Sequence, residues 1–242
     1  MILTCRIEVP VLKKLIALLF VSASAPALAH LTWIDVGEQS LGLSTGHNFP
    51  AKEITVKGEY VQSVECVNKD GAIFNLPFDD NSIRYTYKER PANCLATLKT
   101  TLIELSPRQG AQHFEENKVS KALVNKVLKS DKFSELYFKA AQIKPIEKDG
   151  DLYNPKMAQF VTLKGDDSTV YVYRNGVPVP NLPIGLEYPE TPITLWSNTD
   201  AAGKVTLLLQ PTSKALLRTL ITEEDGTGYK SQFLSVILDP GS

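Results

Sequence analysis

Short runs rich in β-branched and aromatic residues follow one another from residue 30 to about residue 106, a pattern typical of β-strands. The runs cover residues 54–66, 82–88 and 95–105. Polar turn sequences separate them, among them Lys69-Asp70-Gly71. We therefore expect this part of the chain to be mostly β.

The periodicity changes between about residues 115 and 142. Apolar residues first recur along one helical face: Val119, Leu123, Val124, Val127 and Leu128. A second set follows Ser130 or Asp131, either of which is a candidate helix cap: Phe133, Leu136, Tyr137 and Ala140. This spacing predicts a helix pair, or one kinked helix, that covers a sheet.

From about residue 160 the strand pattern returns. Residues 169–173 alternate and meet Asn175-Gly176, a strong hairpin signal because both central residues of the turn need positive φ. Further strands are expected at residues 193–196, 205–209, 215–221 and 233–238. We therefore predict a mostly β chain with two domains. They are an N-terminal β-rich domain (30–155), which holds the helical segment at about 115–142, and a C-terminal immunoglobulin- or transthyretin-like β-sandwich (156–242).

The first 29 residues have the pattern of a secretory signal peptide. Basic residues precede a short apolar run at residues 15–21, and Ala27-Leu28-Ala29 matches the small-x-small pattern that a signal peptidase cuts. The apolar run is shorter than the roughly 20 residues that a membrane-spanning helix needs. We expect export to the periplasm or beyond, with His30 as the first residue of the mature protein.

The charge of the chain excludes some partners. The formal net charge is −1, so there is no strong basic field to attract nucleic acid or an anionic membrane. Beyond the signal peptide, no segment is apolar enough to span a membrane. We expect a mature protein that does not cross one.

Three cysteines are present, and Cys5 leaves with the signal peptide. Cys66 and Cys94 then form the one pair in the mature chain. In an oxidising compartment such a pair most simply forms a disulfide, and the spacing matches neither a redox motif nor a zinc motif. We predict a structural disulfide.

The three histidines, His30, His47 and His113, are the main candidate metal ligands. Cleavage before His30 would give this residue a free α-amine, which can close a six-membered chelate together with its ring Nδ1. Both nitrogens titrate near neutral pH, so protons compete only modestly with a metal ion. Such donors suit nickel, cobalt, copper or zinc rather than calcium or magnesium.

His47 lies in a turn-like segment, residues 45–50. A strand that leaves His30 and returns through residues 41–44 would bring the two histidines together in a three-nitrogen site similar to a histidine brace. The alternative is an N-terminus that merely begins with histidine and a turn histidine bonded to the backbone. Both interpretations remain open on the sequence.

Other residues are weaker candidates for the same site. Asp35 and Glu38 could supply oxygen ligands or orient a ligand, although solvated carboxylates are the simpler interpretation. His113 precedes the predicted helix, where a surface or capping role is preferred to ligation. Residues 42–46 match the G-x-S-x-G motif of α/β-hydrolases, but no helical pattern follows and we set that motif aside.

The segments HLTWI (30–34) and GHNFP (46–50) resemble a secreted domain-of-unknown-function family. Its members begin Ala-His-x-x-Trp at the cleavage site and carry a Gly-His-x-Phe segment soon after. Residues 170–180 and 198–205 are similar to its C-terminal hairpin and turn. The family is similar to periplasmic components associated with nickel and cobalt uptake transporters. The resemblance implies nickel or cobalt as the metal, His30 and His47 as ligands, and a membrane metal transporter as partner.

We therefore predict a periplasmic metal-binding accessory of nickel or cobalt uptake, without catalytic residues. Two alternatives remain open. One is a copper histidine-brace oxidative enzyme, which would need a flat aromatic binding face and an axial Tyr or Phe; Trp33 and Phe49 are near in sequence, although Trp33 suits the core better. The other is a metal-free immunoglobulin-like interaction module.

Overall fold

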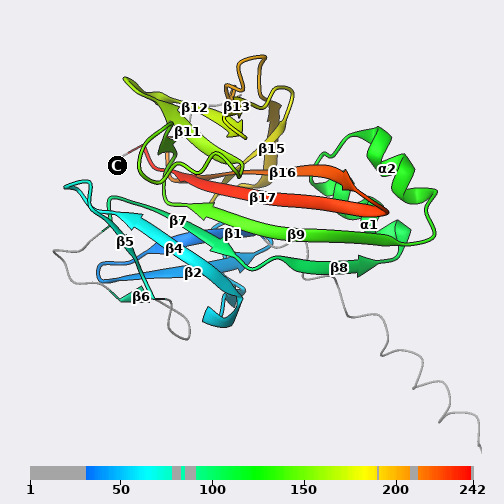
Figure 1. The fold of residues 1–242 in the computed structure, drawn as a ribbon, viewed down its shortest axis with the longest axis horizontal. Coiled ribbons are helices and arrows are strands. Elements are labelled where there is room, and N and C mark those ends of the chain that lie inside the picture. The colour runs from blue at the N-terminus through cyan, green and yellow to red at the C-terminus, as the bar shows by residue number, and fades with distance from the viewer. Residues whose placement is uncertain (1–30, 78–82, 85–90, 190, 208–211, 241–242) are drawn as a thin grey trace, which may run out of the picture.

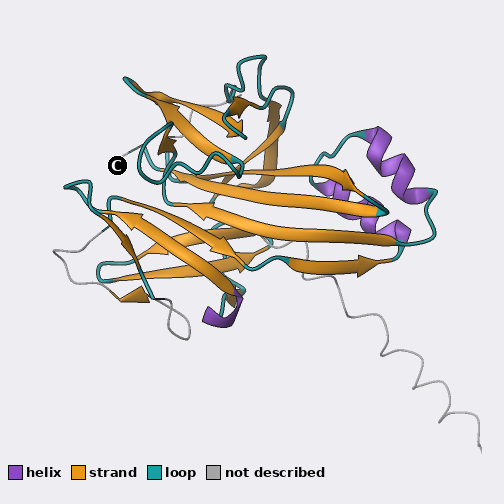
Figure 2. Ribbon diagram, in the orientation of Figure 1, coloured by secondary structure: helices purple, strands orange, loops and turns teal. Residues whose placement is uncertain are grey.

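The computed structural model describes residues 31–240 except 78–82, 85–90, 190 and 208–211. The predicted signal peptide and His30 therefore lie outside the described residues. The chain is mostly β with one short helical insertion, as the sequence predicts (Figures 1 and 2). Within the described residues, no helix is both long enough and apolar enough to cross a membrane.

The largest unit is a nine-stranded sheet (Figure 1). Its strands in spatial order are β15 (Thr191–Asn198), β14 (Pro183–Tyr188), β16 (Ala215–Asp225), β17 (Gly228–Leu238), β9 (Phe133–Gln142), β7 (Asn93–Leu98), β4 (Val61–Val67) and β5 (Ile73–Asn75), and β8 (Thr101–Leu105) also pairs with β9. β9 runs parallel to β17 along one edge, and β7 and β8 share its other edge. This sheet therefore contains strands from both sides of residue 155, the predicted domain boundary. The division into two domains stays a prediction.

Two smaller sheets accompany the large one. The first contains β1 (Leu31–Val36), β2 (Ser40–Gly46), β3 (Ile54–Thr55) and β6 (Ile83–Arg84). The second contains β10 (Ile146–Glu147), β11 (Gln159–Leu163), β12 (Asp166–Arg174) and β13 (Val177–Pro178). A 3-10 turn, η1 (Gly58–Tyr60), precedes β4.

The central strands are buried on both faces because their apolar residues alternate between two cores. On β16, Leu217 packs in a core with residues of β11 and β12, whereas Leu216 and Leu220 pack in a core with both helices and β1. The large sheet is thus covered on one face by the second small sheet and on the other by the helices and β1.

The helical insertion as a whole begins and ends earlier than the sequence pattern predicts. Its helices are α1 (Pro107–Glu116) and α2 (Lys121–Leu128), although α2 coincides with the first predicted helical face at residues 119–128. At the start of α1, Ser106 and Gln109 form a reciprocal capping box and Pro107 occupies the first turn. The predicted helical segment at about 115–142 is therefore wrong in its second half.

The residues predicted as a second helix form strand β9 instead. Phe133 and Tyr137 lie on one face of this strand, together with the buried Glu135 and the half-buried Lys139. These two charged residues hide the alternation that marks a strand, and the remaining apolar residues then match helical spacing. Pairing with β17 along eight residues decides the conformation.

The hairpin predicted at Asn175-Gly176 is confirmed. Both residues have positive φ, 53° and 76°, and Arg174 pairs with Val177 across the turn. The strands expected at residues 193–196, 215–221 and 233–238 lie within β15, β16 and β17. Part of the strand expected at residues 205–209 falls outside the described residues.

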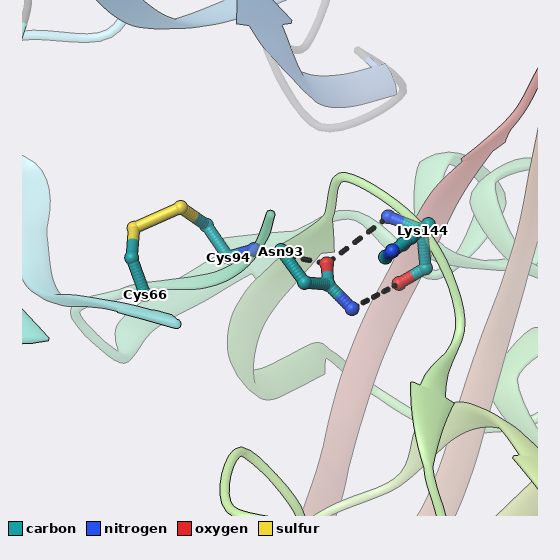
Figure 3. Close-up of a disulfide and its surroundings, with 4 residues drawn as sticks. All are labelled: Cys66, Asn93, Cys94 and Lys144. Carbon is teal, nitrogen blue, oxygen red and sulfur yellow. Dashed lines mark hydrogen bonds between the residues drawn. A yellow bond between two sulfur atoms is a disulfide. The ribbon is translucent and has the colours of Figure 1, made fainter. Parts of the chain in front are cut away.

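The predicted disulfide between Cys66 and Cys94 is also confirmed. The two cysteines face each other on β4 and β7, with their Cα atoms 4.1 Å apart. Beside them, the Asn93 amide donates to the carbonyl oxygen of Lys144 and accepts from the Lys144 N–H (Figure 3). It also donates to the carbonyl oxygen of Pro145. The disulfide and Asn93 together join β4 and β7 to the chain that follows β9.

Strand β1 lies across the face of β9 and β17. Thr32 of β1 accepts a hydrogen bond from Lys139 Nζ at 3.1 Å, and its carbonyl oxygen accepts one from Ser235 Oγ. The Lys139 amine also lies 5.8 Å from the ring centre of Tyr137 and 5.7 Å from that of Phe233. Burial in this position lowers the pKa of Lys139 from 10.5 to about 8.

We expect removal of the disulfide to lower the free energy of unfolding by about 3 to 4 kcal/mol, because the cross-link restricts the unfolded chain. The double variant Cys66→Ala/Cys94→Ala should show this loss in urea denaturation. Wild-type protein denatured with a reductant should match the variant. An unchanged unfolding midpoint in both would contradict a stabilising role.

The lowered pKa of Lys139 makes stability depend on pH. Between pH 8 and 10.5 the unfolded chain holds this proton and the folded chain does not, so the contribution of Lys139 to stability rises with pH. The free energy of unfolding of the wild type, relative to Lys139→Met, should rise by up to roughly 3 kcal/mol from pH 7 to 10.5. Urea titrations at several pH values measure it, with Lys121→Met as the exposed control. A difference that does not change with pH would contradict the prediction.

Candidate metal site

The candidate site lies at the open end of the β1–β2 hairpin. These strands pair in register from Leu31 with Gly46 to Val36 with Leu41. In the sequence, His30 directly precedes Leu31 and His47 directly follows Gly46. The last described pair of the hairpin is therefore flanked in the sequence by His30 and His47, the two histidines predicted as ligands.

Gly46 allows the chain to turn sharply after β2. A Cβ atom at this position would clash with the carbonyl oxygen of Ala51 and would lie 3.4 Å from Cη2 of Trp33. The chain returns so closely that the Glu53 N–H donates to the Thr45 carbonyl oxygen at 3.0 Å. This return brings Glu53 next to the residue that follows Gly46.

The Glu53 carboxylate holds the His47 ring. Nδ1 of His47 lies 2.7 Å from Oε2 and 2.9 Å from Oε1 of Glu53, and the His47 backbone N–H donates to Oε1 at 3.1 Å. When Nδ1 carries the proton of a neutral ring, the lone pair is on Nε2, on the opposite side of the imidazole. A carboxylate on one ring nitrogen is the usual companion of a metal ligand on the other.

Glu53 was not selected from the sequence. Its contact with His47 depends on the pairing of β2 with β3, in which Thr45 lies opposite Ile54. The available signal was only its position as the first carboxylate after the Gly-His turn.

Asp35 lies away from this end of the hairpin. It pairs with Gly42, four pairs from the Leu31–Gly46 end, or about 13 Å along the strand. Its carboxylate accepts hydrogen bonds from Trp33 Nε1 and Ser44 Oγ and lies 2.9 Å from Lys52 Nζ. These contacts account for Asp35 as a structural residue.

The other weak carboxylate candidate, Glu38, is also distant from the histidines. It is exposed in the turn that joins β1 to β2, at the closed end of the hairpin. The hairpin therefore separates both carboxylates from its open end.

His113 is buried in α1, so the expectation of a surface or capping position is wrong. It is 4% exposed and packs against the rings of Phe114, Phe133 and Tyr137. Its Nε2 lies 3.3 Å from Oε2 of the fully buried Glu135, without the geometry of a hydrogen bond. The structure thus places His113 in the core, whereas His47 is in an exposed turn.

Several buried polar atoms around His113 have no hydrogen-bond partner among the described residues. They are both ring nitrogens of His113, both carboxylate oxygens of Glu135 and the hydroxyl of Tyr137. Burial raises the pKa of Tyr137 well above 10, and the nearby Glu135 carboxylate adds to this effect, while Arg218 opposes it. Burying polar groups without hydrogen bonds costs free energy, so this cluster lowers the stability of the folded state.

Trp33 and Phe49 belong to the core. They are 1% and 4% exposed, and their rings meet edge to face with centres 5.5 Å apart. The expectation that Trp33 is a core residue is confirmed. These two residues therefore do not supply the exposed aromatic face that a polysaccharide-cleaving enzyme would need.

Within the part of the chain that the structure describes, no group of three or more His, Cys, Asp or Glu residues is arranged to hold a metal ion. That part contributes His47, oriented by Glu53, to the predicted site. The remaining ligands of the prediction, the amine and ring of His30, fall outside the described residues.

Comparisons with known proteins assign no chemistry to these residues. Models of protein families, curated proteins and solved structures each gave no match to this chain. The family resemblance of residues 30–34 and 46–50 stays a prediction.

Proposed function

We propose that the exported, mature protein binds a divalent transition-metal ion through His30 and His47 and delivers it to a membrane transporter. The register of β1 and β2 carries this proposal. The last described pair of this ladder is Leu31 with Gly46, and in the sequence His30 and His47 directly flank that pair at the open end of the hairpin.

The donor set determines the class of metal. The α-amine and Nδ1 of His30, together with Nε2 of His47, would give three nitrogen ligands, with Glu53 holding the His47 ring from its other side. Nitrogen donors favour nickel, cobalt and copper, and the family resemblance favours nickel or cobalt. A site on an exposed turn would also exchange its ion readily, as delivery requires.

Export and the finer fold assignment are part of the same proposal. The Cys66–Cys94 disulfide supports an oxidising compartment such as the periplasm. For the C-terminal part we retain the immunoglobulin- or transthyretin-like sandwich, supported by the core shared between β14–β17 and the sheet of β11 and β12.

The free amine of His30 gives the sharpest test. Protein that begins at His30 should bind Ni²⁺ or Cu²⁺ in calorimetry, and protein that retains Ala29 should bind at least about tenfold more weakly, because the chelating amine becomes an amide. His47→Ala should weaken binding similarly, whereas Asn48→Ala, its exposed neighbour, should not. Equal affinity of the two N-terminal forms would refute the proposal.

Glu53 should act on the metal through His47. Loss of a carboxylate that orients a ligand histidine weakens metal binding by about 10- to 100-fold. Glu53→Gln should show this loss in the same titration. Glu38→Gln removes an equal charge from the closed end of the hairpin and serves as the control. If both variants lose affinity equally, Glu53 contributes only net charge.

A further inference from the structure

A cavity of about 370 Å³ lies where residues 54–60 and β2 meet β7, β8 and β9. This volume falls in the range of roughly 300–1,000 Å³ that is typical of small-molecule sites. The metal proposal does not use this cavity.

The inner wall of the cavity combines apolar and cationic groups. Ile103 of β8 is 7% exposed, and Phe138, Tyr137 and Lys139 of β9 line the same space. The Lys139 amine is held by Thr32 at 3.1 Å and lies over the Tyr137 ring. Tyr137 is 5% exposed, and its hydroxyl has no hydrogen-bond partner in the described part of the chain. That hydroxyl is closed off from solvent, so the half-buried Lys139 supplies the polar group of this wall.

The outer lining is apolar at its rim. Ile54 and Tyr60 line the cavity, yet they are 51% and 56% exposed. Large apolar side chains that remain in water beside a cavity indicate a surface that an apolar group can cover. The cavity therefore has an apolar entrance and a polar, cationic interior.

The charged residues of the lining are all lysines. Lys57, Lys99 and Lys139 line the cavity, and the described lining residues include neither Asp nor Glu. Lys57 lies 4.0 Å from Glu59, but both side chains are more than 60% exposed, so this pair contributes little. The cavity therefore favours an anionic ligand.

We propose that this cavity binds a small organic carboxylate with an apolar tail. The carboxylate lies at Lys139, and the tail runs past Ile103 to the rim formed by Ile54 and Tyr60. A charge pair is stronger in this partly dehydrated position than at the surface, because water screens it less. The proposal is independent of metal binding.

Calorimetry with decanoate, decanol and acetate tests the proposal on the mature protein at pH 7. Decanoate should bind with one-to-one stoichiometry. Decanol, which has the same tail without the charge, should bind at least about tenfold more weakly, and acetate should show no binding. Equal affinity for decanoate and decanol, or no binding of decanoate, would overturn the proposal.

Variants locate the ligand. Lys139→Met should weaken decanoate binding at least about tenfold and leave decanol within about twofold, whereas the exposed control Lys121→Met should change neither. Thr101 lies on the same face of β8 as Ile103 and lines the cavity, so Thr101→Trp should fill it and abolish binding of both probes. Binding that survives in Thr101→Trp would show that decanoate binds elsewhere and would overturn the assignment.

Circular dichroism and urea denaturation check that each variant folds. If Lys139→Met does not fold, Lys57→Met/Lys99→Met replaces it, because these two lysines are exposed at the cavity. That double variant should weaken decanoate binding more than decanol binding. An equal effect on the two probes would contradict a role for charge in recognition.

Discussion

Pairing along both edges of β9 connects the layers of this molecule. One edge joins β17, the last strand in chain order that the structure describes, and the other edge joins β7 and β8. Its side chains enter separate cores on the two faces, Ala140 on one side and Phe133 and Tyr137 on the other. Because β1 and α1 both pack on β9, the placement of the N-terminal hairpin depends on this strand as well.

The position of β9 also explains the unusual chemistry of its side chains. Glu135 and Lys139 lie on the face that β1 and the helices cover, so both leave water on folding. Contacts in the folded protein offset the cost of removing these two charges from water only in part. Lys139 donates to Thr32 and lies over two aromatic rings, and its pKa is lowered to about 8, whereas the Glu135 carboxylate lies near His113 and Tyr137 without a hydrogen bond among the described residues. Charged groups kept at such positions are commonly used for binding.

Features that depend on neighbouring residues or on composition could be predicted from the sequence. The cysteine count predicted the disulfide, and the need for positive φ at Asn175 and Gly176 predicted the hairpin. Helix α1 also has a local signal, the capping residue Ser106 followed by Pro107, which the apolar periodicity does not register. The helix predicted at β9 is wrong because the strand pairing of β9 is long-range, and no local pattern indicates which distant strand it joins.

The candidate site likewise contains one residue that the sequence predicts and one that it does not. His47 could be selected because its turn is visible in the sequence, but Glu53 could not, because its contact arises from three-dimensional closure of the chain after β2. Gly46 makes this closure possible, since a side chain there would collide with Ala51. The glycine beside the histidine is therefore a geometric requirement: it lets Glu53 reach Nδ1, and this contact in turn leaves Nε2 as the ring nitrogen suited to a metal ion.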